Sequence, residues 1–465
     1  MTPDAPQTPT AGWRDLLAPA TLSRFAFLCL GMWLNAADAL VTVTLTPTIA
    51  AEIGGFQYFG WSVAAYLLGA IVAGVCSGRL SMELGLRPAI AVAGVAYAAG
   101  CAVSALAPDF FVFVAGRLVQ GLGAGAIAAL CYVAINQIFP ERLWVRVISA
   151  LAGVWGVATV LGPLIGGVFA QIDWWRGAFW FFAVQGVLFV GATFLLVKAS
   201  VQPEGPKPRL PWPQFVVLGL GVTMIAAAGT TGRLATDLAL AIGGLAGLWL
   251  LLKLDARSGG VLLPASAGDL RSLAGAGYFV IFALEASTVA FSVYGPAFVQ
   301  VLHGASPLVA GYVITAMAAG WTIVALLVAG VENRDGLMIR AGAALAVAGL
   351  AFGAWALPFG PLWTAAAAMA LIGAGFGVSW AFLSKTIIGG LPEAERPLGS
   401  SAVPTAQMIG GAFGAAGASA LAGALGFAEG VDRVSGPAAG AWLFGAFVPL
   451  AALGVLAAWQ VGRRA

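Results

Sequence analysis

The chain has 465 residues, of which 61% are hydrophobic and only 9% are charged, with mean hydropathy +0.96 and formal net charge +3. Soluble globular proteins carry roughly 25% charged residues, so this composition excludes a soluble fold and predicts an all-α polytopic membrane protein. The small net charge gives no support to a nucleic-acid partner.

Fourteen apolar runs are long enough to cross a bilayer, which takes about 20 residues. The polar, Pro-rich segment before them lacks the order of a cleavable signal, so the first run is expected to direct insertion. The runs are 24–50, 58–78, 88–107, 110–138, 144–170, 177–197, 214–231, 235–253, 275–301, 307–330, 337–357, 361–389, 399–427 and 438–460.

The positive charges predict the orientation of these runs. With a cytoplasmic N-terminus, 17 of the 22 Lys and Arg fall in cytoplasmic segments and only three fall in outer loops. Arg117 and Lys385 lie within runs, and Lys385 is close enough to the inner end to reach the headgroups. This bias predicts cytoplasmic N- and C-termini.

Two polar linkers divide the runs into six, two and six. The first linker contains five prolines, which cannot continue a helix. The expected parts are a cytoplasmic segment 1–23, a six-helix bundle 24–198, a linker 199–213, a two-helix hairpin 214–254, a linker 255–274 and a six-helix bundle 275–465.

The two groups of six resemble a distant repeat. Each opens with a run that carries one acid, Asp38 or Glu285, among hydroxyl side chains on the same helical face. Related bundles of this kind place a site between them near the midplane in many secondary transporters. The matching positions are Asn35, Asp38, Thr42 and Thr46 against Glu285, Thr288 and Ser292; Tyr66 against Tyr312; and Ser149 with Gly162 against Ser401 with Gly414.

Asp38 lies near the middle of the first run, where burial disfavours the charged form of a carboxylate. It can therefore exchange a proton for a cationic substrate, or serve as half of a structural ion pair with Arg117. The two side chains differ in depth by about 7 Å at 1.5 Å per residue, which long side chains can bridge. Glu285 also has two alternatives: it binds a proton or a cation, or it makes a polar contact between helices.

Several stretches resemble the major facilitator superfamily, and within it the fourteen-span drug:proton antiporter family. They are "DALVTVTLTP" (38–47), "WSVAAYLL" (61–68), "GRLVQGLGAG" (116–125) and "GPLIGG" (162–167). The matching positions are Asp38 and Pro47, Trp61 and Tyr66, Arg117 with Gln120 and Gly121, and Gly162, Pro163, Gly166 and Gly167.

The resemblance implies a major facilitator fold and roles for these residues. Proton coupling is expected from Asp38, Glu285 and Arg117. Substrate binding is expected from Asn35, Asp38, Thr42, Trp61, Tyr66, Gln120, Glu285 and Thr288. The antiporter element Gly162, Pro163, Gly166 and Gly167 is expected to form a hinge or tight seam between the halves. A cytoplasmic charge latch is expected from Gly78, Arg79, Glu83, Gly85 and Arg87.

Motifs for other chemistry are missing from the sequence. It has no phosphate-binding loop with Lys-Ser/Thr, a single His, and four Cys without metal-site spacing. We therefore expect no enzyme, no metal and no cofactor, with the proton gradient as the energy source.

The function expected is proton-coupled export of small amphipathic compounds by alternating access, in a bacterial inner membrane. The expected partners are a small-molecule substrate and membrane lipid, with no nucleic acid, and the chain is expected to be a monomer. The alternatives are a symporter or uniporter for a metabolite, a channel, and a non-transporting membrane sensor.

Overall fold

The computed structural model describes residues 18–198, 210–228, 231, 233–328, 331, 333–427 and 430–464. The regular secondary structure of these residues is helical, with three short 3-10 helices, among them η1 (Phe56–Tyr58) and η2 (Ala265–Gly268). The first group of α-helices is α2 (Pro19–Ile53), α3 (Phe59–Leu84), α4 (Leu86–Leu106), α5 (Phe110–Ile138), α6 (Glu141–Gln171) and α7 (Trp175–Leu196). The others are α8 (Trp212–Ala227), α9 (Leu234–Arg257), α10 (Leu273–His303), α11 (Pro307–Val328), α12 (Asp335–Phe359), α13 (Leu362–Gly389), α14 (Arg396–Ala424), α15 (Gly436–Gly445) and α16 (Val448–Gly462).

The helices have the length and surface of membrane spans. Among the described residues, twelve helical stretches are long and apolar enough to cross a membrane. Large apolar side chains cover their outer faces, such as Leu195 and Leu327, which are 86% and 76% exposed. Helices suit this setting because every backbone N–H and C=O must be satisfied within the chain when water is absent. The predicted multi-pass helical class is therefore confirmed.

Three boundaries differ from the sequence prediction. The run 438–460, expected as one helix, is broken between α15 and α16, because Pro449 lacks an N–H and stands in the first turn of a new helix. The helix α8 begins at Trp212, inside the segment expected to be a linker, with Pro213 in its tolerated first turn. It is 16 residues long, shorter than the twelve spans. The helix α2 begins at Pro19, within the expected segment 1–23; residues 1–17 and 199–209 lie outside the described residues.

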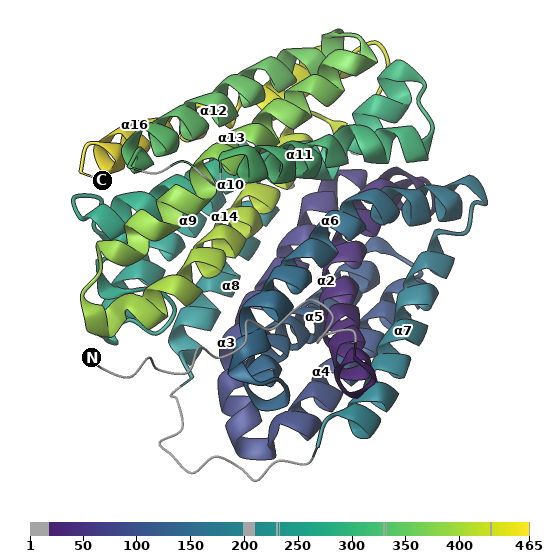
Figure 1. Cartoon of the computed structure of the whole chain (residues 1–465). Coiled ribbons are helices and arrows are strands. Elements are labelled where there is room, and N and C mark those ends of the chain that lie inside the picture. The colour runs from purple at the N-terminus through teal and green to yellow at the C-terminus, as the bar shows by residue number, and fades with distance from the viewer. Residues whose placement is uncertain are drawn as a thin grey trace, which may run out of the picture.

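The helices form two groups with the same internal contacts. In the first half, α2 to α7, the closest pairs include α2–α6, α3–α5, α4–α5 and α4–α7. In the second half, α10 to α16, the corresponding pairs α10–α14, α11–α13, α12–α13 and α12–α16 are in contact. Figure 1 shows the first half in purple and blue and the second half in green and yellow. This correspondence is what the predicted repeat requires.

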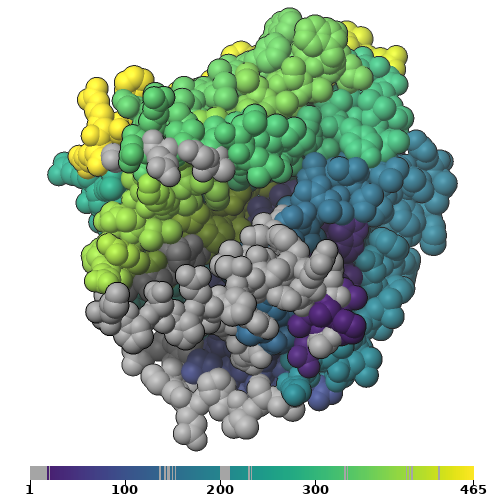
Figure 2. Space-filling view, in the orientation of Figure 1, coloured from purple at the N-terminus to yellow at the C-terminus, as the bar shows by residue number. Residues whose placement is uncertain are grey.

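The contacts between the halves follow the same symmetry. Helix α3 contacts α14, and its counterpart α11 contacts α6, which is the counterpart of α14. Helices α2 and α10 contact each other. In the space-filling view, the green surface of the second half meets the blue surface of the first directly (Figure 2). The halves are therefore related by a pseudo-two-fold axis, the arrangement in which transporters hold a site at the repeat interface.

Helices α8 and α9 lie between the halves in the sequence and pack against each other. Helix α8 also contacts α14 and α3, while α9 contacts η2 in the following linker. Helix α9 is largely exposed, with only 11% of its most apolar window buried. The pair therefore borders both halves without entering either group of six.

Candidate functional site

A closed polar network surrounds Asp38 inside the first half. Arg117, on α5, donates from Nη1 to Asp38 Oδ2 at 2.9 Å and to Gln120 Oε1 at 2.8 Å. Gln120 in turn donates from Nε2 to Asp38 Oδ1 at 2.7 Å. The ion pair with Arg117, one of the two alternatives for Asp38, is present, and both carboxylate oxygens have a donor. A charge-assisted pair of this kind, with both carboxylate oxygens hydrogen-bonded, can persist in a low-dielectric interior.

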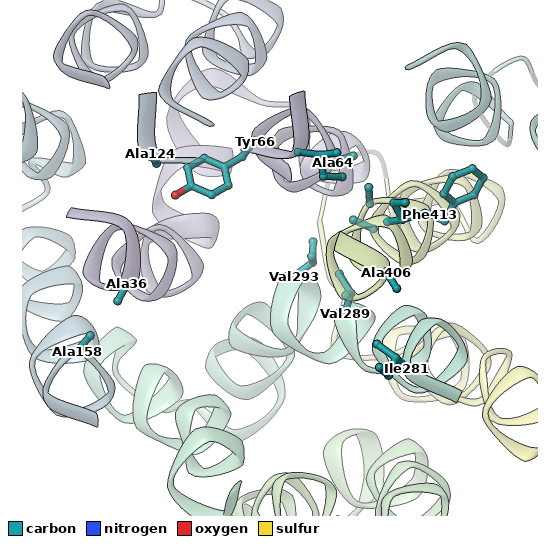
Figure 3. Close-up of a cluster of buried hydrophobic side chains, with 14 of the residues drawn as sticks. Ala36, Ala64, Tyr66, Ala124, Ala158, Ile281, Val289, Val293, Ala406 and Phe413 are labelled. Carbon is teal, nitrogen blue, oxygen red and sulfur yellow. The ribbon is translucent and has the colours of Figure 1, made fainter. Parts of the chain in front are cut away.

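A second layer of polar groups holds this network in place. The Arg117 guanidinium lies 4.4 Å from the centre of the Tyr66 ring, a cation–π contact. Tyr66 reaches from α3 towards the helix that carries Ala36 (Figure 3), where its hydroxyl donates to Asn35 Oδ1 at 2.9 Å. Gln120 Nε2 also lies 3.1 Å from Cys101 Sγ on α4. Four helices therefore converge on Asp38, and α4 contributes Cys101, a residue that no sequence motif singled out.

Two first-half residues predicted to bind substrate lie outside this network. Thr42 is buried one turn beyond Asp38, and its hydroxyl has no hydrogen-bond partner in the described part of the chain. Trp61 turns towards α8, where its Nε1 donates to the carbonyl oxygen of Ala226 at 2.9 Å. In the structure, Trp61 therefore connects the first half to α8.

Glu285 occupies a different environment on α10. Its Oε2 accepts from Gln407 Nε2 on α14 at 3.1 Å, and its backbone carbonyl accepts from Thr288. Within the described residues no salt bridge joins it to a cation. The glutamate is half-buried, and a Cβ added at Gly411 of α14 would meet both Leu67 of α3 and the Glu285 side chain. Glu285 is therefore close to the boundary between the halves.

Gln407 is the functional candidate that the sequence reasoning missed. It carries no charge and belongs to no short motif. It is, however, the only side-chain amide in a stretch of α14, residues 402–424, that consists mostly of Gly and Ala. An isolated amide among small apolar residues is the signal that could have identified it.

The "GPLIGG" glycines pack α6 tightly against α2. A Cβ added at Gly162 would lie 2.6 Å from Leu40 Cβ, and one added at Gly166 would lie 2.9 Å from Thr44 Cβ. Both distances are shorter than real Cβ contacts, so these positions accept only glycine without movement of α2. Helix α6 continues through Pro163.

The same element also reaches across to the second half. A Cβ at Gly167 would lie 2.8 Å from Leu308 Cβ on α11. In return, a Cβ at Gly311 of α11 would lie 2.9 Å from Pro163 Cβ. The element therefore lies at a close seam between the halves.

The residues of the predicted latch make their described contacts within the first half. Arg79 pairs with Glu83 on the same helix at 2.8 Å. Gly85 forms the turn between α3 and α4 with φ +84°, and a Cβ at Gly78 would meet nothing within 4 Å. Arg87 donates to the carbonyl oxygen of Phe194 on α7 at 2.8 Å. Lys385, expected at the headgroups, pairs with Asp335 at 2.7 Å.

Comparison with known proteins gives a consistent result. The family model described as Major Facilitator Superfamily matches residues 28–415. A protein of Mycobacterium tuberculosis named as a probable multidrug-efflux transporter is 30% identical over 98% of this chain and 97% of its own length. A second protein of that organism, an uncharacterized MFS-type transporter, is 27% identical over 94% of this chain and 64% of its own length.

Solved structures share the fold at low sequence identity. A peptide transporter has a TM-score of 0.67 at 15% identity, covering 95% of each chain. A D-xylose–proton symporter has a TM-score of 0.62 at 18% identity, covering 95% of this chain and 97% of its own. At these identities the likeness concerns the fold alone.

Proposed function

Because the chain belongs to the major facilitator superfamily and is a membrane transporter rather than an enzyme, we propose that it exports small amphipathic compounds in exchange for protons. The 30% identical relative named for multidrug efflux supports the export of such compounds. The order of the helices is six, two and six when α15 and α16 are counted as one candidate span. This order and the motifs shared with the fourteen-span antiporters support placement in that family, with α8 and α9 as the inserted hairpin.

The observation that carries the proposal is the difference between the two intramembrane acids. Asp38 is fully enclosed and compensated by Arg117 and Gln120. Glu285 is half-buried close to the boundary between the halves. Its side-chain partner among the described residues is the neutral amide of Gln407. An acid held in a membrane without a compensating cation marks a proton or cation site. Glu285 is thus the acid for which a proton and a cationic substrate compete.

Asp38 then acts as the conformational partner of that exchange. Its bonds to α5 hold the first half in one arrangement, so protonation of Asp38 would release Arg117 and loosen α2 from α5. Facing outward, Glu285 or Asp38 takes a proton and the substrate leaves; facing inward, the proton departs and substrate binds. The strong positive charge bias supports cytoplasmic termini in a bacterial inner membrane.

Transport by the reconstituted protein tests this proposal. Proteoliposomes that enclose a fluorescent lipophilic cation are exposed to a pH gradient of either sign. We expect the cation to move against its own gradient while protons move the opposite way, and Glu285→Gln to abolish the response. Glu393→Gln, which changes an exposed glutamate in the same half, serves as the matched control and should transport normally.

Binding measured against pH provides the second readout. If a proton and substrate compete for Glu285, the affinity for the cation rises as pH rises, because the carboxylate loses its proton. Glu285→Gln should bind weakly and without pH dependence. Movement of cation and protons in the same direction would identify a symporter, and transport that ignores the pH gradient would rule out proton coupling.

A further inference from the structure

A cavity of about 250 Å³ lies between the hairpin and the second half, and neither acid lines it. Its walls come from α9, α10, α14 and the linker that joins α9 to α10. The lining is almost wholly apolar and includes Trp249, Leu252, Leu270, Tyr278, Phe282 and Ile409. No part of the proposed proton exchange uses these residues.

The cavity opens on the lipid-facing side of the molecule. Three of its lining residues, Leu245, Trp249 and Leu270, are 58%, 61% and 50% exposed. Its volume lies just below the roughly 300–1,000 Å³ of sites that enclose a drug-sized ligand. Its size and apolar lining suit a segment of hydrocarbon chain entering from the bilayer.

The wall formed by the linker is fixed by a buried carboxylate. Asp255, at 2% exposed, accepts from the backbone N–H groups of Val261 and Leu262 at 3.1 Å and of Leu263 at 2.9 Å. Further along, Gln460 of α16 donates to the carbonyl oxygen of Leu270 at 2.9 Å. The linker is thus anchored at both sides of the cavity, which makes the cavity a built feature of the fold.

Positive charges gather at the end of the cavity where α9 finishes and α10 begins. The Lys253 ammonium lies 5.7 Å from the centre of the Trp249 ring. Arg271 follows the lining residue Leu270, and Arg464 donates to the Arg271 carbonyl oxygen at 2.5 Å. Two acids, Asp269, which accepts from the Arg271 N–H, and the buried Asp255, lie near these three exposed cations and are outnumbered by them. The excess of positive charge is complementary to an anionic headgroup.

We propose that this cavity is a binding site for an anionic phospholipid. One acyl chain occupies the apolar cavity, and the phosphate headgroup lies against Lys253 and Arg271. The lipid comes from the leaflet at the end where α9 finishes and α10 begins. It joins the hairpin to the second half, so its chain completes the packing between α9 and α10.

Native mass spectrometry of the full-length protein in detergent tests the site, with phosphatidylglycerol and phosphatidylcholine of equal chain length as probes. Gly268→Leu fills the cavity: a Cβ at Gly268 lies 3.4 Å from Leu252 Cβ, an ordinary contact, so the backbone accepts a side chain. Gly191→Leu is the matched control, because a Cβ there meets nothing within 4 Å. Lys253→Gln tests the headgroup contact, with Lys198→Gln, another exposed lysine, as its control.

The wild type should retain one phosphatidylglycerol in preference to phosphatidylcholine. Gly268→Leu should weaken this binding about fifteenfold, as expected when about two methylenes lose their burial, and Lys253→Gln about fivefold. Both control variants should bind as the wild type does. Equal retention of the two lipids, or equal binding by Gly268→Leu and Gly191→Leu, would overturn the proposal. The Gly268→Leu variant could itself be destabilised, which a lower unfolding temperature than wild type in lipid-free detergent would show. In that case the Leu252→Trp variant, which fills the same cavity from α9, is measured in its place.

Discussion

Asp38 and Arg117 keep opposite charges almost completely out of contact with solvent, at 1% and 3% side-chain exposure. Burial of two charges is compensated only when the geometry is good and the remaining donors and acceptors are paired. Gln120 supplies part of this pairing by accepting from Arg117 and donating to Asp38 at the same time, while the buried Arg117 Nε has no hydrogen-bond partner among the described residues. At this scale, the three side chains form one unit in which the loss of any member leaves another unpaired.

Arg117→Ala should therefore be strongly destabilising, by about 3–5 kcal/mol, because it leaves the Asp38 carboxylate buried without its cation. The double variant Asp38→Asn with Arg117→Gln should cost clearly less than the sum of the single variants. Unfolding in detergent measures each free energy.

Lys385→Gln provides the control for this prediction. It breaks an ion pair whose lysine is 71% exposed, so it should change the free energy of unfolding by about 1 kcal/mol or less. Comparable losses for Arg117→Ala and Lys385→Gln would show that the buried network contributes no more than a surface pair.

At the scale of the helices, glycines set how closely neighbouring elements approach. A Cβ at Gly373 of α13 would lie 1.8 Å from the carbonyl oxygen of Met317 on α11. In the first half, a Cβ at Gly121 of α5 would lie 2.0 Å from the carbonyl oxygen of Tyr66 on α3. These are equivalent helix pairs in the two halves. Small residues let helices pack backbone to backbone in a bilayer, where hydrophobicity does not drive helices together.

Gly373→Ala should lower the free energy of unfolding by about 1–3 kcal/mol, the usual cost of forcing atoms into a packed interior. Gly389→Ala, on the same helix, should have little effect because its Cβ meets nothing within 4 Å. Thermal unfolding of both purified variants compares them directly. A Gly373 variant as stable as the Gly389 variant would mean that α11 and α13 can separate without cost.

At the scale of the whole molecule, the halves are bound together at one end. We call it the Gln57 end, after the residue between α2 and α3 whose carbonyl oxygen accepts from Tyr294 of α10 at 2.9 Å and from Ser419 of α14 at 2.6 Å. The hydroxyl of Tyr312 on α11 also donates to the Val160 carbonyl oxygen on α6 at 3.0 Å. The structure is thus closed between the halves at the Gln57 end, the end expected to face outward.

Gly60→Ala should open this end. A Cβ at Gly60 of α3 would lie 2.0 Å from the carbonyl oxygen of Ala415 on α14, so the halves must separate there. Alternating access requires the opposite ends to approach when this end opens. Spin labels at Leu84→Cys and Glu393→Cys, with Cys29 and Cys76 replaced, should show shorter distances in the Gly60 variant. Gly74→Ala, on the same helix with an open Cβ position, should leave the distances unchanged. An unaltered distribution for Gly60→Ala would show that closure tolerates a methyl group.

The sequence by itself determined the class and the approximate positions of most helices, and it offered pairing with Arg117 as one of two roles for Asp38. It could do so because hydrocarbon forces the backbone into helices and makes every intramembrane charge conspicuous. Only the tertiary structure decided that Gln407 is the partner of Glu285, that Trp61 turns to α8, and that the halves are closed at the Gln57 end. These features depend on how each helix is rotated and which neighbour its small residues admit. In α14, Gly and Ala make up most of residues 402–424, so few side chains there indicate which side of the helix faces α10.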